Sequence, residues 1–292
     1  MGRPEILKIA IRQLEEKCEG GTTDGHVYVP LSHTIKMKKL TYLLAVVAFL
    51  MSCVLAHAVD PDKDLLIYLP FDEGQGNKAE DVGPNGFVGD IKNAKWVEGV
   101  SGQALQFKGG SVNFDPLKID QPEEMTIEFW FKPDEKIDSG ARIDLLYRLQ
   151  GGGRPHVTFN RGGILFGYYF ATQGVELPIH TTYDAFESEW YYFVGTQSKK
   201  TGWMYINGEL DAETEAGGDA RMDFGTQGMC IAASQGNANF FNGMVDEFKM
   251  WSVAFTADDV KNSMEKTLAV QAEGKLTTTW GKIKSGSDGI RF

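Results

Sequence analysis

Cysteine, histidine and proline are all scarce in this chain. Its 292 residues include three cysteines, five histidines and ten prolines. Cys18, Cys53 and Cys230 form no Cys-x-x-Cys pair and no cluster with histidine at zinc-binding spacing, which argues against a structural zinc site. If the N-terminal segment described below is removed, Cys230 alone remains, and a lone cysteine forms no internal disulfide. We therefore expect the fold to rest on its apolar core.

Positive charge is also in short supply. The chain has 29 lysines and arginines against 40 aspartates and glutamates, giving a net charge of -11. Such a surface repels phosphate backbones, which argues against nucleic acid as a partner. It is compatible with neutral sugars, and with Ca²⁺ held by carboxylates. Hydrophobic residues make up 42% and aromatic residues 12% of the chain, enough for a sizeable core.

Residues 37–58 have the pattern of a secretory signal peptide. Lys38-Lys39 supplies a short basic start, Leu40–Leu55 is mostly apolar, and Ala56-His57-Ala58 is a cleavage site of the Ala-x-Ala type. The apolar run is too short and ends too abruptly for a membrane span. We expect cleavage before Val59, and a mature protein that is secreted, periplasmic or on the cell surface without a stable membrane span.

The position of this segment is unusual, because signal peptides begin at the start of a chain. We therefore hypothesise that Met37 is the true initiator and that residues 1–36 are a non-native upstream extension. One alternative is a membrane anchor with a cytoplasmic head. Another is a lipoprotein modified at Cys53, since the residues before it loosely resemble a lipobox. Met51 fits a lipobox poorly, which favours simple cleavage.

From Val59 onward, short apolar or alternating runs are separated by glycine-containing turns. In Met125–Lys132, alternation puts Ile127, Phe129 and Phe131 on one face and Thr126, Glu128 and Trp130 on the other. Trp203–Ile206 is followed at once by Asn207-Gly208, a pair that suits a type I′ turn. The chain shows no βαβ alternation and no heptads. Short strands at this spacing predict an all-β, two-sheet antiparallel sandwich.

One helix is predicted near the C-terminus, over Ala257–Lys266. Thr256 is the expected N-cap, and two aspartates follow in the first turn, where the helix dipole favours them. Val260 and Met264 lie four residues apart and would dock the helix on the sandwich. We expect a single domain over residues 59–267 and a C-terminal tail over 268–292.

Five sequence blocks occur in a fixed order along residues 62–266. They are Tyr68–Gly74 with Asp81–Gly86, Val100–Phe107, Thr126–Pro133, Trp190–Gly208 and Phe241–Phe248. Taken together, they resemble the laminin-G-like jelly roll of the concanavalin A-like lectin/glucanase superfamily. The resemblance implies a jelly-roll sandwich followed by a short helix. Residues 143–184 match none of the blocks.

The resemblance also implies a structural Ca²⁺ ion, held by an acidic residue of the last strand and by carbonyl groups of the N-terminal part. Asp246 matches the last-strand position, and Asp72, Asp81 and the carbonyl of Gly110 are the expected partners. Ca²⁺ takes about six to eight oxygen ligands, both carboxylates and carbonyls. The alternative is that Asp246 only caps a turn and Asp72 is a solvated loop acid.

The superfamily includes glycoside hydrolases, which need two carboxylates on the substrate face. In the hydrolase branch these acids usually lie two or four residues apart on one strand. Asp144 is the single acid in Ile143–Leu149, and Glu128 has no acidic partner at that spacing within Met125–Lys132. Asp246 and Glu247 are adjacent, so a regular strand points them to opposite faces. No histidine lies in a recognisable nucleophile context. We therefore predict that the protein is not an enzyme.

Sugar-binding faces use aromatic rings that stack on pyranoses, with amides and acids that read hydroxyl groups. The aromatic candidates are Tyr168, Tyr169, Tyr191 and Trp203, and Asn237 is a polar candidate. Each aromatic has the alternative role of packing in the core. The predicted function is a secreted, non-catalytic binding or adhesion domain with carbohydrate as the leading ligand. The alternatives are a protein-interaction or structural module of a cell-surface assembly and, third, a glycoside hydrolase.

Overall fold

The computed structural model describes residues 59–119, 122–138, 142–148, 156–160, 163–170, 175–183, 185–198, 201–215 and 228–269. The predicted signal peptide, the segment upstream of it and the chain beyond residue 269 lie outside these ranges. Those predictions therefore stay predictions. Among the helices in the described ranges, none combines the length and apolar character needed to cross a bilayer.

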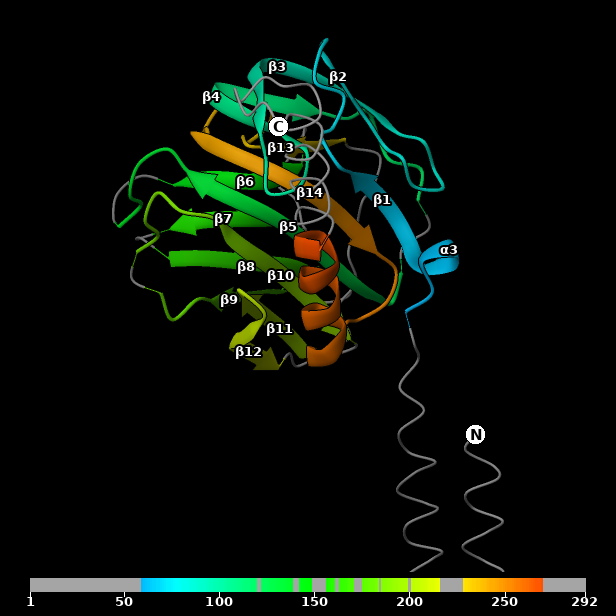
Figure 1. Ribbon diagram of the computed structural model, residues 1–292. Coiled ribbons are helices and arrows are strands. Elements are labelled where there is room, and N and C mark those ends of the chain that lie inside the picture. The colour runs from blue at the N-terminus through cyan, green and yellow to red at the C-terminus, as the bar shows by residue number, and fades with distance from the viewer. Residues whose placement is uncertain are drawn as a thin grey trace, which may run out of the picture. The chain divides into compact units, whose positions relative to one another are not determined.

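The described chain is built almost entirely of β-strands, with a short helix near each end (Figure 1). The helices are α3 (Pro61–Asp64) and the C-terminal helix, residues 257–269. The strands are β1 (Leu65–Leu69), β2 (Lys78–Glu80), β3 (Val88–Glu98), β4 (Gln103–Asn113), β5 (Glu124–Pro133), β6 (Ile143–Arg148), β7 (His156–Asn160), β8 (Gly163–Phe170), β9 (Val175–His180), β10 (Tyr191–Ser198), β11 (Thr201–Ile206), β12 (Glu209–Glu215), β13 (Met229–Ile231) and β14 (Gly243–Trp251).

All ladders between these strands are antiparallel, in the order β12-β11-β10-β5-β14-β4-β13-β6-β7-β8-β9. The sheet curls on itself, so that β9 and β12 at its two ends lie against each other. Thr182, just after β9, donates from its backbone N–H to the Asp211 carboxylate of β12 at 3.1 Å. The predicted antiparallel sandwich is therefore confirmed, with its two layers joined into one hydrogen-bonded sheet.

Strand β4 joins the two layers. In the strand order, the first layer lies on one side of β4 and comprises β12, β11, β10, β5 and β14, and the second lies on the other side and comprises β13, β6, β7, β8 and β9. Its residues Leu105–Phe107 pair with β14 of the first layer, while Val112 and Asn113 pair with β13 of the second. Between these stretches, β3 carries a bulge at Asn93, which has a φ of 49°. A Cβ atom on Gly110 would lie 2.3 Å from the carbonyl oxygen of Asn93. Glycine is therefore required where β4 crosses from one layer to the other.

The core between the layers is rich in phenylalanine. Phe129 of β5 stacks on Phe193 of β10 with ring centroids 5.0 Å apart, and Phe131 contacts Phe159 of β7 across the layers at 5.6 Å. Ile127, Phe129 and Phe131 all point into this core, as their alternation predicts. The core is continuous along β5 and reaches both layers.

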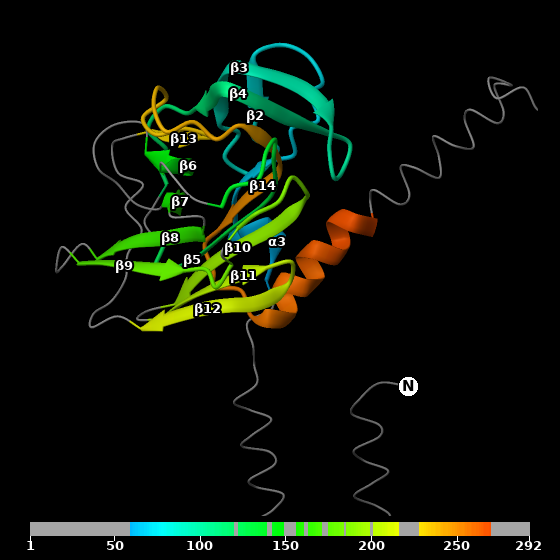
Figure 2. The same cartoon turned by 90° about the vertical axis from the view of Figure 1, so that its left-hand side faces the viewer.

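The opposite face of β5 is also buried. Trp130 belongs to a second apolar cluster with Tyr192 and Val260 of the C-terminal helix. Figure 2 shows this helix and strands β6 to β9 on opposite sides of the layer that contains β10 and β11. Thr256 caps the helix as predicted, since its Oγ1 accepts the N–H of Asp259 at 3.2 Å. The helix therefore covers the outer face of the first layer.

The crossing of β4 yields a stability prediction. Gly110→Ala places a methyl group against backbone carbonyls that cannot move without breaking the hairpin. We expect a loss of about 2 kcal/mol in the free energy of unfolding. Thermal unfolding followed by circular dichroism should show a melting temperature about 5 °C lower. Lys108→Ala is the control, because this exposed side chain lies two residues away on the same strand. Equal melting temperatures for Gly110→Ala and the native protein would contradict the close approach of Gly110 to the Asn93 carbonyl group at this crossing.

Candidate functional site

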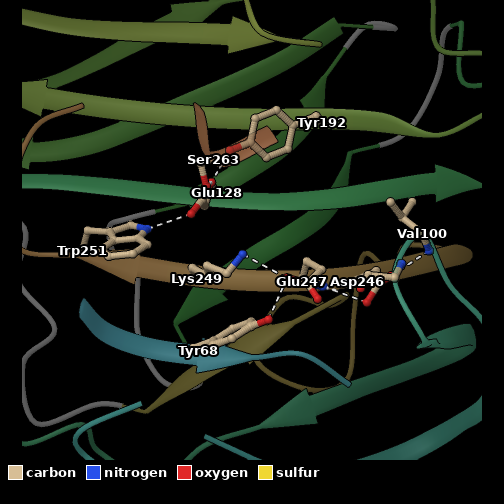
Figure 3. A network of polar contacts seen from close by, with 10 residues as sticks. Tyr68, Val100, Glu128, Tyr192, Asp246, Glu247, Lys249, Trp251 and Ser263 are labelled. Atoms are coloured by element: carbon tan, nitrogen blue, oxygen red, sulfur yellow. Dashed lines mark hydrogen bonds and ion pairs between the residues drawn. The ribbon is translucent and has the colours of Figure 1, made fainter. Parts of the chain in front are cut away.

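The outer face of the first layer contains a buried polar network (Figure 3). Glu128 of β5 lies at its centre and accepts hydrogen bonds from the Tyr192 hydroxyl, from Trp251 Nε1 at 2.8 Å and from Ser263 Oγ at 2.7 Å. Ser263 lies on the C-terminal helix. A mid-strand glutamate that faces away from the apolar core therefore attaches the helix to the sheet.

Two further acids of the network, Asp246 and Glu247, lie on β14. Glu247 accepts from the Tyr68 hydroxyl and from Lys249 Nζ, both at 2.9 Å. Burial lowers the pKa of Lys249, but the charges of Glu128 and Glu247 outweigh that effect and leave this pKa raised. Removing one partner of such a buried ion pair costs about 3–5 kcal/mol. The network is therefore structural in character, and all its groups are engaged.

The expectation that Asp246 and Glu247 face opposite ways is wrong. β14 has a bulge between Asp246 and Lys249, and Glu247 adopts a φ of 53°. The bulge inserts one extra residue, so both acids point to the outer side of the sheet (Figure 3). Their carboxylates nevertheless bind different partners and do not flank an open cleft.

Asp246 is fully buried and serves as an anchor for a turn. Its Oδ2 accepts the N–H groups of Val100 at 2.8 Å and Ser101 at 3.1 Å, and its Oδ1 accepts the N–H of Glu247. Burial raises the pKa of this carboxyl to about 8, the charge of Glu247 adds to the rise, and the N–H donors oppose it. This is the turn-capping role that the sequence analysis left open for Asp246.

The other predicted calcium ligands also have structural partners. Asp81 is buried, and its Oδ1 accepts the N–H groups of Tyr68 and Gly83 at 2.8 Å. Asp72 is exposed and accepts the N–H of Gln103 at 2.7 Å, on the turn that Asp246 also holds. Because amide hydrogens already point at these oxygens, a cation would have to displace them.

Gly110 is too far from Asp246 to share an ion with it. Asp246 lies opposite Ala104 on β4, because the preceding pair is Val245 and Leu105. Gly110 is six residues further along β4, or roughly 20 Å away. No group of three acidic, histidine or cysteine side chains within the described ranges is placed to hold a metal. The four positions do not fit one Ca²⁺ site.

Among the predicted ligand-binding residues with described side chains, Tyr191, Trp203 and Asn237 do not share one site. Tyr191 is only 4% exposed and stacks on Phe131 in the core at 5.4 Å, so its ring offers no face to a ligand. Trp203 is half-buried on the outer face of β11, where its Nε1 donates to Glu213 at 3.2 Å. Asn237 is exposed in a turn after β13. Tyr168 and Tyr169 pair with β9 through their backbones, and their side chains lie outside the described structure.

A groove of about 550 Å³ opens at the rim of the sandwich, beside the crossing of β4. It lies where β5 ends, β6 begins and the chain enters β14. Its lining residues are Lys108, Gly109, Asp134, Glu135, Lys136, Ile137, Ile143, Phe240 and Asn242. Apolar surface and hydrogen-bonding groups therefore share one concave site, as in small-molecule binding pockets.

Two polar side chains of this groove are held in fixed positions. Asn242 Oδ1 accepts the N–H of Gly109 at 2.8 Å, and Asp134 Oδ1 accepts from Gln106 Nε2 at 2.9 Å. The remaining amide nitrogen of Asn242 and the second oxygen of Asp134 have no partner among the described residues. One donor and one acceptor are thus held ready for a ligand that both donates and accepts.

Sequence reasoning missed this groove. Asn242 belongs to one of the sequence blocks that carry the resemblance, and Asp134 directly follows the proline that ends β5. The position of each residue at the end of a strand was therefore the signal available for predicting it. Ile143 lies in the stretch that matched no block. Nothing in the local pattern indicated that these segments meet.

The curled antiparallel sandwich, its C-terminal helix and its open rim groove define a jelly-roll domain with a concave site. The profile of the concanavalin A-like lectin/glucanases superfamily matches residues 107–261, more than half of the chain. The chain therefore belongs to this superfamily, and the resemblance seen in its sequence blocks is confirmed. The search of curated proteins found no match to this chain.

Several solved structures share the fold. The binding domain of Paraclostridial Mosquitocidal Protein 1 has a TM-score of 0.56 and 16% identity, covering 70% of this chain and 52% of its own. The binding domain of botulinum neurotoxin DC in complex with SialylT has a TM-score of 0.56 and 11% identity, covering 71% and 52%. The same domain in complex with rat synaptotagmin II has a TM-score of 0.56 and 12% identity, covering 71% and 52%. This chain spans about half the length of these structures, and at such identities the likeness shows the fold alone.

The raised pKa of Asp246 predicts a dependence of stability on pH. The folded-state pKa of about 8 exceeds the ordinary value of 3.8, so the folded protein keeps a proton that the unfolded chain releases. The resulting stabilisation is complete below about pH 4 and is lost as the pH rises to about 8, by at most ~1.4 kcal/mol per pH unit. Denaturant unfolding of the native protein and of Asp246→Asn, which cannot ionise, should give a difference that declines across this range. A constant difference from pH 4 to 8 would contradict the burial of a protonated Asp246.

The occupied carboxylates of Asp81 and Asp246 yield a prediction about calcium. We expect the same melting temperature in Ca²⁺ and in chelator, because binding would require three N–H hydrogen bonds to be given up at each residue. Differential scanning calorimetry of a protein comprising residues 59–267 measures this directly. A rise in melting temperature with Ca²⁺ that Asp246→Asn abolishes would restore the site implied by the resemblance.

Proposed function

We propose that the domain over residues 59–267 is an exported, non-catalytic module that binds carbohydrate in the rim groove. The observation that carries the proposal is the composition of the groove. Phe240, Ile137 and Ile143 supply apolar surface, and Asn242 and Asp134 present a donor and an acceptor. Sugars combine apolar ring faces with hydroxyl groups that donate and accept, and this lining matches both properties.

The arrangement of acids in the groove favours binding over hydrolysis. Its carboxylates, Asp134 and Glu135, are consecutive residues of one loop. A glycoside hydrolase needs carboxyl groups on two sides of the scissile bond, about 5–10 Å apart. Among the described lining residues, the segments around Lys108, Ile143 and Phe240 contribute no carboxylate. The described lining thus contains no pair of carboxylates on two sides of the groove.

The structural likenesses support a binding role. The similar structures are binding domains, and those of botulinum neurotoxin DC were determined with SialylT and with rat synaptotagmin II. Export rests on the signal-peptide pattern over residues 37–58. A protein partner is the alternative occupant, and the experiment below distinguishes it from a glycan.

Phe240→Ala tests the groove. Loss of the ring should weaken the best ligand from a glycan array about tenfold in titration calorimetry, since an aromatic contact contributes about 1 kcal/mol or more. Trp203→Ala is the matched control, because it removes an aromatic outside the groove that the sequence analysis proposed as a ligand contact. Circular dichroism of both variants confirms their folding.

The opposite pattern, with Trp203→Ala abolishing binding and Phe240→Ala leaving it intact, would move the site to the outer face of β11. A silent glycan array combined with stoichiometric binding of one purified surface protein would replace the carbohydrate proposal with the protein-interaction module.

A further inference from the structure

A smaller hollow adjoins the rim groove. It has a volume of about 320 Å³ and is lined by Asn93, Ala94, Lys95, Gln106 and Lys108. Lys108 lines both the hollow and the groove, so the two meet at this side chain. The lining residues of the hollow include two cations and two amides but no carboxylate. Its chemistry therefore differs from that of the groove.

The β3–β4 hairpin determines which side chains face the hollow. Lys95 and Gln106 are cross-strand partners, and Lys108 is two residues further along β4, which puts all three on one face. The bulge at Asn93 bends β3 next to them. The hollow is thus a product of the same irregularity that lets β4 cross between the layers.

Both lysines are exposed and uncommitted. Neither Lys95 nor Lys108 has a hydrogen bond or an ion pair to any residue in the described ranges, although acids outnumber bases by 40 to 29 in the chain. Asp134, an acid of the adjoining groove, forms its side-chain hydrogen bond with the neutral Gln106 amide at 2.9 Å and not with either lysine. The lining of the hollow therefore carries two ammonium groups and no carboxylate, whereas the acids Asp134 and Glu135 line the adjoining groove.

We propose that this hollow binds an anionic group, a carboxylate or a sulfate ester, on the sugar that the groove holds. The inference rests on the proposed function and adds a ligand class to it, namely acidic glycans. Ammonium groups form charge-assisted hydrogen bonds with such oxyanions. The ammonium group of lysine is a point charge on a flexible side chain, unlike the planar guanidinium group of arginine. It can therefore pair with either a carboxylate or a sulfate ester. Asn93 and Gln106 offer further hydrogen-bonding groups in the same hollow.

Three oligosaccharides based on galactose, its sulfate ester or its uronic acid test the proposal. They are fragments of polygalacturonate, which carries carboxylates, of κ-carrageenan, which carries sulfate esters, and of neutral galactan. Titration calorimetry on the mature domain should show at least one acidic fragment bound about tenfold more tightly than the neutral one. This preference should shrink at high ionic strength, because salt screens exposed charges. The fragment preferred identifies the anionic group.

Lys95→Ala, which lies outside the groove, should lower the affinity for the acidic fragment by about tenfold and leave the affinity for galactan unchanged. Lys108→Ala should lower the affinity for the acidic fragment by a similar factor. Lys63→Ala is the matched control, since it removes the same charge near the opposite end of β14, roughly 25 Å away along the strand. It should leave both affinities unchanged. Equal melting temperatures of the three variants show that the fold is kept.

Binding of galactan as tight as that of the acidic fragments overturns the anionic site, and so do lysine variants that bind the acidic fragments like the native protein. Failure to bind any acidic fragment also overturns it. The glycan-array experiment with Phe240→Ala decides the proposed function separately. If the domain binds neutral glycans through Phe240 but does not prefer acidic ones, the proposed function stands and only the acidic-glycan inference is wrong.

Discussion

The attachment of the β3–β4 hairpin to β14 is the constraint on which the rest of the structure depends. At one end, the buried carboxylate of Asp246 accepts the N–H groups of the turn at Val100 and Ser101. At the other end, Asn242 accepts the N–H of Gly109, beside the crossing between layers. Asp246 of β14 and Asn242, the residue before β14, thus fix both the turn of the hairpin and the edge of the groove. The position of the candidate site follows from this double attachment.

The sequence predicted those structural features that depend on the pattern of residues close together in the chain. Alternation along β5 placed Phe129 in the core, Asn207-Gly208 adopts the expected left-handed turn with φ values of 54° and 82°, and Thr256 caps the helix. The bulge at Glu247 was not predictable, because no residue type there favours a positive φ and the conformation depends on three neighbouring strands. The groove escaped prediction for a related reason. Lys108 and Asn242 are 134 residues apart, and only the curl of the sheet brings their segments together.

Aromatic residues misled the search for a ligand site, and the reason is the burial of both faces of the first layer. Tyr191 packs between the layers, while Trp130 and Tyr192 pack beneath the C-terminal helix. The hydrogen bond from Ser263 to Glu128 holds the helix there, and Trp251 of β14 is a second donor to the same desolvated carboxylate. A face committed in this way is closed to ligands. The open concave surface lies at the rim instead, where polar groups and half-buried apolar side chains meet at the ends of the strands.

Net charge and local charge give opposite expectations for the ligand. A net charge of -11 argues for neutral partners when the protein is viewed from afar. At physiological ionic strength, however, exposed charges beyond about 8 Å are largely screened, so a ligand in contact with the hollow senses mainly the groups around it. Lys95 and Lys108 are the charged groups that line the hollow, whereas Asp134 and Glu135 line the adjoining groove. An acidic protein can therefore bind an acidic sugar, provided that recognition depends on contact rather than on long-range attraction.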